Sequence, residues 1–443
     1  MTKKKILITG PVCNVSGYSE HARMITDAFL QDDNFEVYIM DLQWSHSTRS
    51  RVYEEKYAEC LSRSQMYFRY LTSTNTSVAD GFDCSYQIRP PNEFEPMTKY
   101  DVGVTAALET ISAPHEWIEN CNKMKKILVV SNHAKKNLEK AQNPETKEKI
   151  TTPIEVVPFY NDLSEDRGTF EAYKDLSTDI NFLCVSQLAP RKNLFEMIGS
   201  FIEEFRDDEN VGLILKTYIR NNSTVDYFQT LNTIKGFVDQ ISKDKKCKIH
   251  LIHGNLNKDE MDSLYDDKTV KGYVSTTHGE GFGIPIFNAV CADIPVVATA
   301  WSGHMDFLSA PVKNPTSGRV KTKNLFLKVP YLIDKVRDDH LMPGLITKDA
   351  KWAYPDKKAF RKNLRALAVS RGYHKKEATL LGKHIRETYT KDKIFAKIID
   401  SANDTKIVSS VDSGDLENKA HHTIQHTTVM MNIGNHIKKM SEK

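Results

Sequence analysis

The residues with the clearest chemical meaning lie in a glycine-rich segment of the second half of the chain, Thr277–Ala289. Three glycines there surround Glu280, and glycines allow backbone N–H groups to face a phosphate. A carboxylate would repel a ligand that consisted only of phosphate. Glu280 fits a ligand that also carries neutral hydroxyls, because a carboxylate accepts hydrogen bonds from them. The segment therefore indicates a nucleotide-sugar, and its predicted ligand contacts are Glu280, Gly281, Phe282, Gly283 and Ile284.

Two adjacent cations, Arg191 and Lys192, precede a predicted helix that begins at Leu194. Cations beside a helix N-terminus can neutralise a diphosphate that also meets the free N–H groups of the first turn. A solvated helix start often has the same residues, so this pattern alone leaves both interpretations open.

A loop near the start of the chain also lies between a predicted strand and a predicted helix. It runs from Gly10 to Tyr18 and contains Ser16 and Gly17. Glycine allows a ligand to approach the backbone closely, and the helix offers N–H groups to an anion. The G-x-G-x-x-G pattern of dinucleotide-binding proteins is absent. An ordinary strand-to-helix connection is the alternative.

Alternating apolar and amphipathic segments must position these three loops. Short apolar runs bounded by turn residues are typical of buried parallel strands in βα units. The predicted strands are Ile6–Thr9, Val37–Met40, Val102–Ala106, Ile127–Val130, Ile154–Val157, Phe182–Ser186, Gly212–Lys216, Ile249–Ile252, Gly272–Ser275 and Pro295–Thr299. The predicted helices are Glu20–Leu30, His115–Asn122, Ala134–Ala141, Leu194–Phe205, Thr224–Ser242 and Lys258–Tyr265.

The predicted strands form two groups, and the polar segment Asp162–Asp179 between them is the expected interdomain linker. The sequence thus predicts an α/β protein with two Rossmann-like, doubly wound parallel-sheet domains that face each other across a cleft. The first domain is expected over residues 1–165 and the second over 178–385. A helix over 386–402 would return to the first domain, and 403–443 would form a flexible polar tail.

The composition narrows the class of protein. The chain has 443 residues, of which 40% are hydrophobic and 27% charged, as expected for folded domains. Its seven cysteines are scattered without C-x-x-C spacing, which argues against a disulfide framework or a zinc site and favours a reducing compartment. No apolar run approaches the ~20 residues of a membrane-spanning helix. These features predict a cytoplasmic protein, in the host cytoplasm if the chain is viral.

With these motifs in this order, the sequence resembles the retaining glycosyltransferases of the large family 4, or group 1, class, which have the GT-B fold. The resemblance covers roughly residues 1–370. In that family an E-x7-E motif binds the donor sugar and the ribose. Glu280 matches the first glutamate, and Asn288 stands at the second position, where it keeps a hydrogen-bonding side chain but loses the charge.

The resemblance extends to the expected diphosphate contacts. Lys192 matches the lysine of the family, whereas Gln187 occupies the usual arginine position and Arg191 is expected to supply the missing charge. The loop at Ser16 and Gly17 is similar to the family's first-domain loop that faces the donor. Donor binding is therefore expected at Ser16, Gly17, Gln187, Arg191, Lys192, Gly281, Phe282, Gly283, Ile284 and Asn288.

The mechanism implied by the resemblance is retaining transfer from a nucleoside-diphosphate sugar, with UDP as the expected nucleotide. The predicted catalytic residues are Glu280, Lys192 and Glu109. Glu109 stands where relatives often place a polar side chain near the reaction centre, and capping of the following helix is the alternative. No Asp-x-Asp metal motif is present, so the prediction includes neither a metal nor a cofactor.

The charge distribution bears on the acceptor. The whole chain has a formal net charge of +3, but residues 313–397 hold 22 Lys and Arg against 8 Asp and Glu, so the remainder is net negative. Such segregation favours a polyanionic partner. A hydroxylated base in phage DNA is therefore one predicted acceptor, bound through residues 313–397.

Three alternatives remain open at this stage. One alternative acceptor is a surface polysaccharide, a lipopolysaccharide or a lipid-linked glycan, with peripheral contact to a membrane. Another alternative is that the cations form only a solvated face. A further alternative, suggested by Asn288 and Gln187, is an inactive sugar-nucleotide-binding partner subunit.

Overall fold

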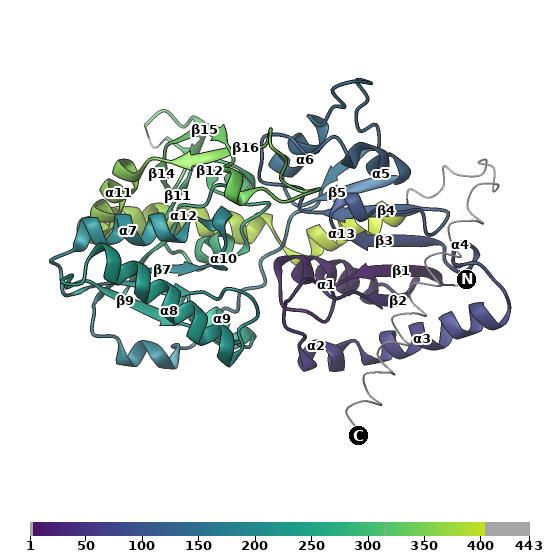
Figure 1. Cartoon of the computed structure of the whole chain (residues 1–443), viewed down its shortest axis with the longest axis horizontal. Helices are drawn as coiled ribbons and strands as arrows, with labels where there is room; N and C mark the ends of the chain where they lie inside the picture. Colours follow the sequence, from purple (N-terminus) through teal and green to yellow (C-terminus); the bar gives the residue numbers. More distant parts are fainter. Residues whose placement is uncertain (1–2, 315, 404–443) are drawn as a thin grey trace.

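The computed structural model describes residues 3–314 and 316–403, and within them the chain forms two α/β domains that lie side by side (Figure 1). Each domain is built on one six-stranded sheet of the described residues, and neighbouring strands in both sheets run parallel. The prediction of two doubly wound parallel-sheet domains is confirmed.

The first sheet has the strand order β2-β1-β3-β4-β5-β6. Its inner strands are buried on both faces, because helices cover both sides of a parallel sheet. Its strands are β1 (Lys4–Gly10), β2 (Phe35–Asp41), β3 (Cys84–Ile88), β4 (Asp101–Thr105), β5 (Lys126–Val129) and β6 (Ile154–Val156). Its helices are α1 (Gly17–Leu30), α2 (Arg51–Lys56), α3 (Ala58–Ser73), α4 (Val78–Gly81), α5 (Trp117–Lys123) and α6 (Asn132–Glu139).

The second sheet has the order β14-β11-β10-β7-β8-β9. Its strands are β7 (Ile180–Val185), β8 (Val211–Lys216), β9 (Lys248–Ile252), β10 (Val270–Ser275), β11 (Val296–Thr299) and β14 (Leu327–Val329). The helices around it are α7 (Leu194–Phe205), α8 (Thr224–Ile241), α9 (Lys258–Ser263), α10 (Ile284–Cys291), α11 (Lys357–Val369) and α12 (Arg371–Thr388).

The structure adds elements that the sequence patterns did not indicate. The strands β3 and β14 complete the two sheets, and α3 covers part of the first. Two antiparallel hairpins are also present. They pair β12 (Ser309–Lys313) with β13 (Val320–Asn324), and β15 (Tyr331–Lys335) with β16 (Lys351–Pro355).

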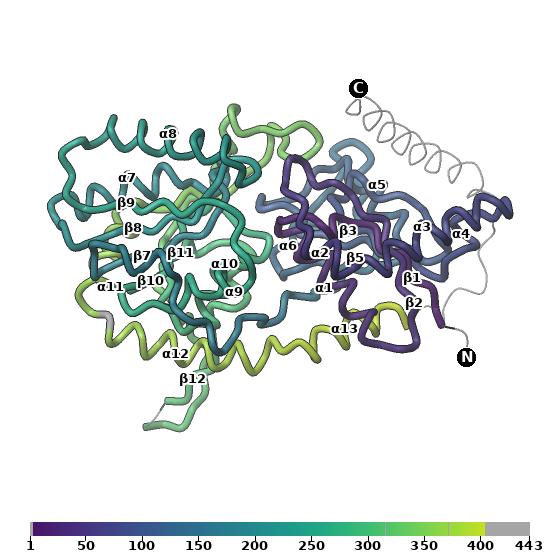
Figure 2. Tube along the Cα trace, turned by 90° about the horizontal axis from the view of Figure 1, so that it is seen from below, coloured from purple at the N-terminus to yellow at the C-terminus, as the bar shows by residue number. Residues whose placement is uncertain are grey.

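The chain crosses between the domains twice. The segment after β6 leads into the second domain and includes the short 3-10 helix η2 (Glu171–Asp175), whose Tyr173 is buried. Later, α12 lies along the second domain, and α13 (Lys391–Asn403) packs on α1 of the first domain (Figure 2). A helix was predicted over 386–402, whereas the structure divides this stretch between the end of α12 and α13. Apart from Asn403, the predicted tail over 403–443 lies outside the described residues.

The two domains share buried apolar contacts. The ring of Phe159, which follows β6, packs on Phe282 of the second domain with their centroids 5.2 Å apart. In the part of the chain that the structure describes, no helix combines the length and apolar character that crossing a membrane requires.

Candidate active site

The two predicted diphosphate-binding cations project from the connection between β7 and α7. This connection contains the 3-10 helix η3 (Pro190–Lys192), which ends at Asn193 in the left-handed conformation with φ of 55°. The side-chain amide of Asn193 donates a hydrogen bond of 3.1 Å to the carbonyl oxygen of Thr276, just after β10. This bond holds Arg191 and Lys192 at the carboxyl edge of the second sheet.

Glu280 lies in the glycine-rich loop between β10 and α10. Gly283 precedes α10 with φ of 94°, a conformation that disfavours any side chain. Only 8% of Glu280 is exposed, so its carboxylate needs charged or polar partners nearby.

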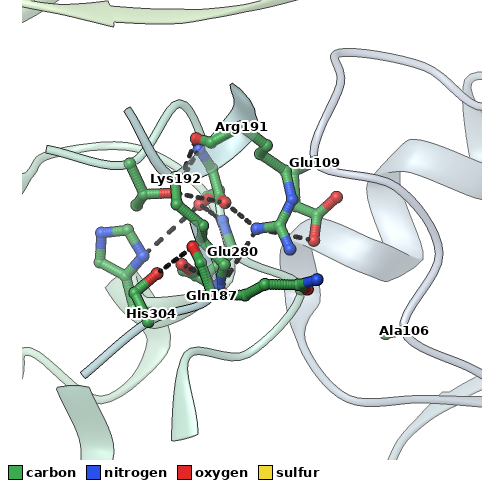
Figure 3. Close-up of polar contacts among 12 residues, drawn as sticks. Ala106, Glu109, Gln187, Arg191, Lys192, Glu280 and His304 are labelled. Atoms are coloured by element: carbon green, nitrogen blue, oxygen red, sulfur yellow. Dashed lines mark hydrogen bonds and ion pairs between the residues drawn. The ribbon is translucent and has the colours of Figure 1, made fainter. Parts of the chain in front are cut away.

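These partners are the two cations, as Figure 3 shows. The Lys192 Nζ atom lies 2.7 Å from both carboxylate oxygens of Glu280. The Arg191 Nη1 atom lies 3.4 Å from Glu280 Oε2 and donates a hydrogen bond of 2.6 Å to the carbonyl oxygen of Gly279. The same nitrogen lies 3.1 Å from Oε1 of Glu109 in the first domain. Two cations thus meet two carboxylates at the domain boundary.

The pKa shifts follow from this arrangement. Burial alone would raise the pKa of the Glu280 carboxyl, but Lys192 and Arg191 outweigh it and lower the pKa to about 2. Burial and the neighbouring Arg191 lower the pKa of Lys192. Burial opposes the charge of Arg191, but Glu109 and Glu280 raise its pKa. The Glu280 carboxylate is therefore ionised at neutral pH and fixed by cations.

A chain of hydrogen bonds fixes the backbone beneath Glu280. The Glu280 N–H donates to Ser302 Oγ at 2.7 Å, and Ser302 Oγ lies 3.5 Å from His304 Nδ1. His304 Nε2 lies 2.7 Å from the carbonyl oxygen of Thr299, which can only accept. Burial lowers the pKa of His304, so its single proton is on Nε2, and Nδ1 can accept from the Ser302 hydroxyl.

The glycine-rich loop touches the first domain without room for side chains. A Cβ atom added to Gly279 would lie 2.6 Å from Glu109 Cβ, and one added to Gly281 would lie 3.0 Å from Ala106 Cβ. The Ser131 hydroxyl, at the start of α6, donates a hydrogen bond of 2.6 Å to the Gly281 carbonyl. These glycines are required because the two domains meet at this loop.

The predicted donor-facing loop before α1 is held by hydrogen bonds of its own. The Ser16 side chain caps α1 by accepting from the Ser19 N–H at 3.1 Å. A Cβ added to Gly17 would meet no atom within 4 Å, so the space over this helix start is open. The buried Arg23 guanidinium donates to the carbonyl oxygens of Val12 and Asn14 at 2.9 and 2.7 Å, and so fixes the course of the loop.

The remaining predicted residues lie outside this ion cluster. Gln187 is exposed, and its amide donates to the Ile219 carbonyl at 2.8 Å. Asn288 is half-buried in α10, and Ile284 begins that helix. Phe282 is buried against other rings, including Phe307 with centroids 4.9 Å apart, so it supports the loop from below.

Sequence reasoning missed the residues that shape the site through the backbone. Neither the residue types nor the spacing of Ser302 and His304 indicate their hydrogen bonds beneath Glu280. Arg23 stands in the amphipathic stretch of α1 and looks like a surface cation in the sequence, although only 4% of it is exposed. Its contacts depend on how the loop folds back over α1, and no spacing pattern indicates that.

The described residues contain no cluster of three or more His, Cys, Asp and Glu side chains arranged to hold a metal ion.

Comparisons with known proteins bear on this geometry. Residues 169–314 match the family model described as "Glycosyl transferases group 1". A comparison of the sequence with curated proteins finds no match.

Among solved structures, sucrose-phosphate synthase from Thermosynechococcus elongatus is similar with a TM-score of 0.59 and 11% identity, covering 91% of this chain and 99% of that chain. Anabaena Alr3699/HepE in complex with UDP and glucose is similar with a TM-score of 0.57 and 12% identity, covering 90% of this chain and 100% of that chain. The lipopolysaccharide outer core galactosyltransferase WaaB is similar with a TM-score of 0.50 and 12% identity, covering 91% of this chain and 100% of that chain.

At these identities the solved structures show the fold, and the family model covers residues 169–314, most of which lie in the second domain. Residues 169–314 are a group 1 glycosyltransferase domain, and the chain as a whole has the two-domain GT-B fold of these solved structures.

Proposed function

We propose that the chain transfers a sugar from a UDP-sugar to a hydroxyl acceptor with retention of the anomeric configuration. The observation that carries the proposal is the placement of Arg191 and Lys192 on the buried Glu280 carboxylate. This arrangement provides cations for a diphosphate and a carboxylate for sugar hydroxyls in one place.

Donor binding would exchange the partners within this cluster. The four charges of Arg191, Lys192, Glu280 and Glu109 sum to zero, so the diphosphate competes with the carboxylates for the two cations. As the cations turn toward the phosphates, the oxygens of Glu280 become free to accept hydrogen bonds from the sugar. The cations and the loop N–H groups then stabilise the charge on the departing diphosphate.

The transfer step needs no covalent enzyme intermediate. The bond between the anomeric carbon and the UDP oxygen breaks while the acceptor oxygen bonds to the same face of that carbon. The acceptor proton passes to the departing diphosphate. Glu109, which contacts Arg191 from the first domain, would orient the acceptor hydroxyl.

Release of UDP from a panel of UDP-sugars, with GDP-mannose as a comparison, tests the donor. We expect release with at least one UDP-sugar and its loss in Glu280→Ala. Binding of UDP-sugars without release from any of them, alone or with acceptors, would instead support the inactive partner subunit. The anomeric configuration of the product, read from its NMR coupling constants, tests retention.

For the acceptor, we propose a polyanionic polymer such as hydroxymethylated DNA. The excess of 14 positive charges over residues 313–397 supports it, but part of this excess is neutralised in space. Arg361 Nη1 lies 2.9 Å from Glu203 Oε2, and Arg365 Nε lies 2.7 Å from Glu204 Oε1, both on α7. Arg386 Nη1 lies 2.8 Å from Asp293 Oδ1. The support from charge therefore comes from the cations that remain exposed.

A surface glycan is the second candidate acceptor. It is suggested by the likeness in fold to the lipopolysaccharide galactosyltransferase WaaB. Incubation with UDP-sugar and either a hydroxymethylated duplex or lipopolysaccharide core separates the two. With a radiolabelled sugar in the donor, we expect the label to appear on the duplex. Label on the glycan alone would contradict a DNA acceptor.

A further inference from the structure

One element of the second domain concentrates positive charge without acidic partners. This element, here named the basic hairpin, comprises Ser309–Asn324 and contains β12, β13 and their connecting turn. It projects from the body of the molecule beyond α12 (Figure 2). Its sequence has four cations and no Asp or Glu, and the cations are Lys313, Arg319, Lys321 and Lys323.

The basic hairpin differs from the other cation-rich elements in its lack of ion pairs. Arg361, Arg365 and Arg386 face carboxylates of α7 and of the turn after α10. All four cations of the basic hairpin are exposed, and among the described residues none has a carboxylate within ion-pair distance. Their field is therefore available to a partner in solution.

The register of the basic hairpin sets the directions of its side chains. Lys321 pairs with Val312 and Lys323 pairs with Ala310 across the ladder. Because side chains alternate along a strand, Lys321 and Lys323 share one face and lie about 7 Å apart along it. Lys313 pairs with Val320 on the opposite face. The hairpin thus presents cations on both faces of a narrow two-stranded ribbon.

The described residues of the hairpin turn form several hydrogen bonds with one another. The Asn314 side-chain oxygen accepts from the N–H groups of Thr316 and Ser317, each at 2.9 Å, and the Asn314 N–H donates to the Arg319 carbonyl at 2.8 Å. Surfaces that enter a membrane interface present Trp, Phe or Leu beside their cations. The described turn residues are Asn314, Thr316, Ser317, Gly318 and Arg319, and none of them is aromatic or aliphatic, which favours a polyanion in water over a lipid surface.

The root of the hairpin lies at the domain boundary. Asp306 in η4 (Gly303–Asp306) is three residues before β12, and its Oδ2 accepts from the Asn132 N–H of the first domain at 2.7 Å. The preceding residues Ser302 and His304 support Glu280. A polymer held by the hairpin would therefore be tethered next to the domain that contains the donor site.

We propose that the basic hairpin is an arm that binds the phosphate backbone of duplex DNA. A two-stranded ribbon is narrow enough to enter the major groove, and its cations would displace counterions from the phosphates. The proposal deepens the DNA acceptor proposed above and rests on it for its biological meaning. The binding itself needs neither donor nor base modification.

The test measures binding of the full chain to an unmodified, fluorescently labelled DNA duplex. Fluorescence anisotropy reports the binding over a range of salt concentrations, without UDP-sugar. The test variant replaces Lys313, Arg319, Lys321 and Lys323 with Gln. The matched control replaces four other exposed cations of the same basic segment, Lys348, Lys358, Lys362 and Lys376, with Gln. Both variants lose the same charge, and UDP release without acceptor serves as the check on folding.

We expect the affinity of the hairpin variant for the duplex to fall at least tenfold at low salt. The slope of log K against log salt concentration should become shallower by about three to four, because each phosphate contact contributes about 0.9 to this slope. The control should retain most of both. The proposal is overturned by equal losses in the two variants, by no loss in the hairpin variant, or by no binding of the unchanged protein to duplex. Hairpin-dependent binding to phosphatidylglycerol vesicles, but not to duplex, would overturn it in favour of a membrane.

The DNA acceptor is judged separately by sugar transfer to a hydroxymethylated duplex. If the duplex binds through the basic hairpin but receives no sugar, the DNA-binding role of the hairpin is supported and the DNA acceptor is contradicted. If the hairpin variant transfers sugar to the duplex as well as the unchanged protein does, the DNA acceptor is supported and the DNA-binding role of the hairpin is contradicted.

Discussion

Glu109 of the first domain and Arg191 of the second form an ion pair across the domain boundary, with Oε1 and Nη1 3.1 Å apart. The same Arg191 nitrogen contacts Glu280 and the Gly279 carbonyl. A diphosphate that draws Arg191 toward itself therefore releases Glu109. Donor binding would thus prepare the first-domain carboxylate for the acceptor, which implies that the donor binds first.

Replacing Glu109 with Gln tests this role. We expect kcat for transfer to an acceptor to fall about 10- to 100-fold, the effect of losing one charged hydrogen bond of about 1.5–3 kcal/mol. The donor KM and the release of UDP without acceptor should change little. Glu116→Gln is the control, because Glu116 is exposed and its carboxylate lies 3.5 Å from His115 Nδ1. An equal loss in transfer and in acceptor-free release would assign Glu109 to domain closure instead.

The ion pair between Glu280 and Lys192 predicts a stability change with pH. The pKa of Glu280 is about 2 in the folded chain, below the ordinary value of 4.5. A lowered carboxyl pKa adds stability above pH 4.5, and this contribution is lost as the pH falls toward 2. At about 1.4 kcal/mol per pH unit, it is on the order of 3 kcal/mol.

Denaturant unfolding of the unchanged protein and Glu280→Gln at pH 7 and pH 3 measures this contribution. The difference in free energy of unfolding between the two proteins should be large at pH 7 and clearly smaller at pH 3. Glu145→Gln, at an exposed site, should show no such trend. A difference that is the same at both pH values would contradict the assigned ion pair.

Gly17 allows the donor site to be probed without disturbing the fold. A Cβ at this position meets no atom within 4 Å, and alanine is favoured over glycine in a helix by about 1 kcal/mol. We expect Gly17→Ala to keep or raise the melting temperature while the donor KM rises about tenfold, because the methyl group enters the space for the diphosphate. Gly236→Ala in α8, which also has open space, should change stability alone. Unchanged donor binding in Gly17→Ala would place the diphosphate elsewhere.

Gly303 is expected to be intolerant of any side chain. A Cβ there would collide with the carbonyl oxygen of Gly281 and approach that of Glu280. Gly303→Ala must therefore displace the glycine-rich loop, and we expect at least a 100-fold loss of kcat/KM with a near-normal circular dichroism spectrum. Gly199→Ala in α7, where the nearest atom is 3.9 Å away, is the comparison. Full activity of Gly303→Ala would mean that the loop position is not needed.

Independence from metal ions is a further prediction. The cations Arg191 and Lys192 are expected to take the role that a divalent ion plays for other diphosphate leaving groups. Transfer measured after dialysis against EDTA should match transfer with added Mg²⁺ or Mn²⁺ within a factor of about two. Loss of activity on EDTA treatment with recovery on Mg²⁺ would contradict the prediction.

The strands with continuous apolar residues could be predicted from the sequence, because burial on both faces leaves few other residue types. β3 has the sequence CSYQI, and its polar residues conceal a strand that is buried throughout. Ser85 is accommodated there because its hydroxyl donates to Asp101 at 2.6 Å. β14 is only three residues long, too short to give a pattern.

The candidate site divides in the same way. Glu280, Arg191 and Lys192 could be selected by residue type and by their position after strands, and the structure brings them together. The support from Ser302 and His304 arises from a turn 22 residues or more along the chain from Glu280, so no local spacing shows it. The contact of Gly279 with Glu109 depends on how two separate domains meet, which the sequence does not encode locally.

The packing of α13 on α1 also determines the order in which the chain can complete its structure. Ile394, Phe395 and Ile398 are at most 5% exposed and belong to the same core as Ile25 and Phe29 of the first domain. This core stays open during synthesis until the ribosome has passed residue 398, by which time all strands of the second sheet have been made. The core of the first domain, which is translated first, is therefore completed last.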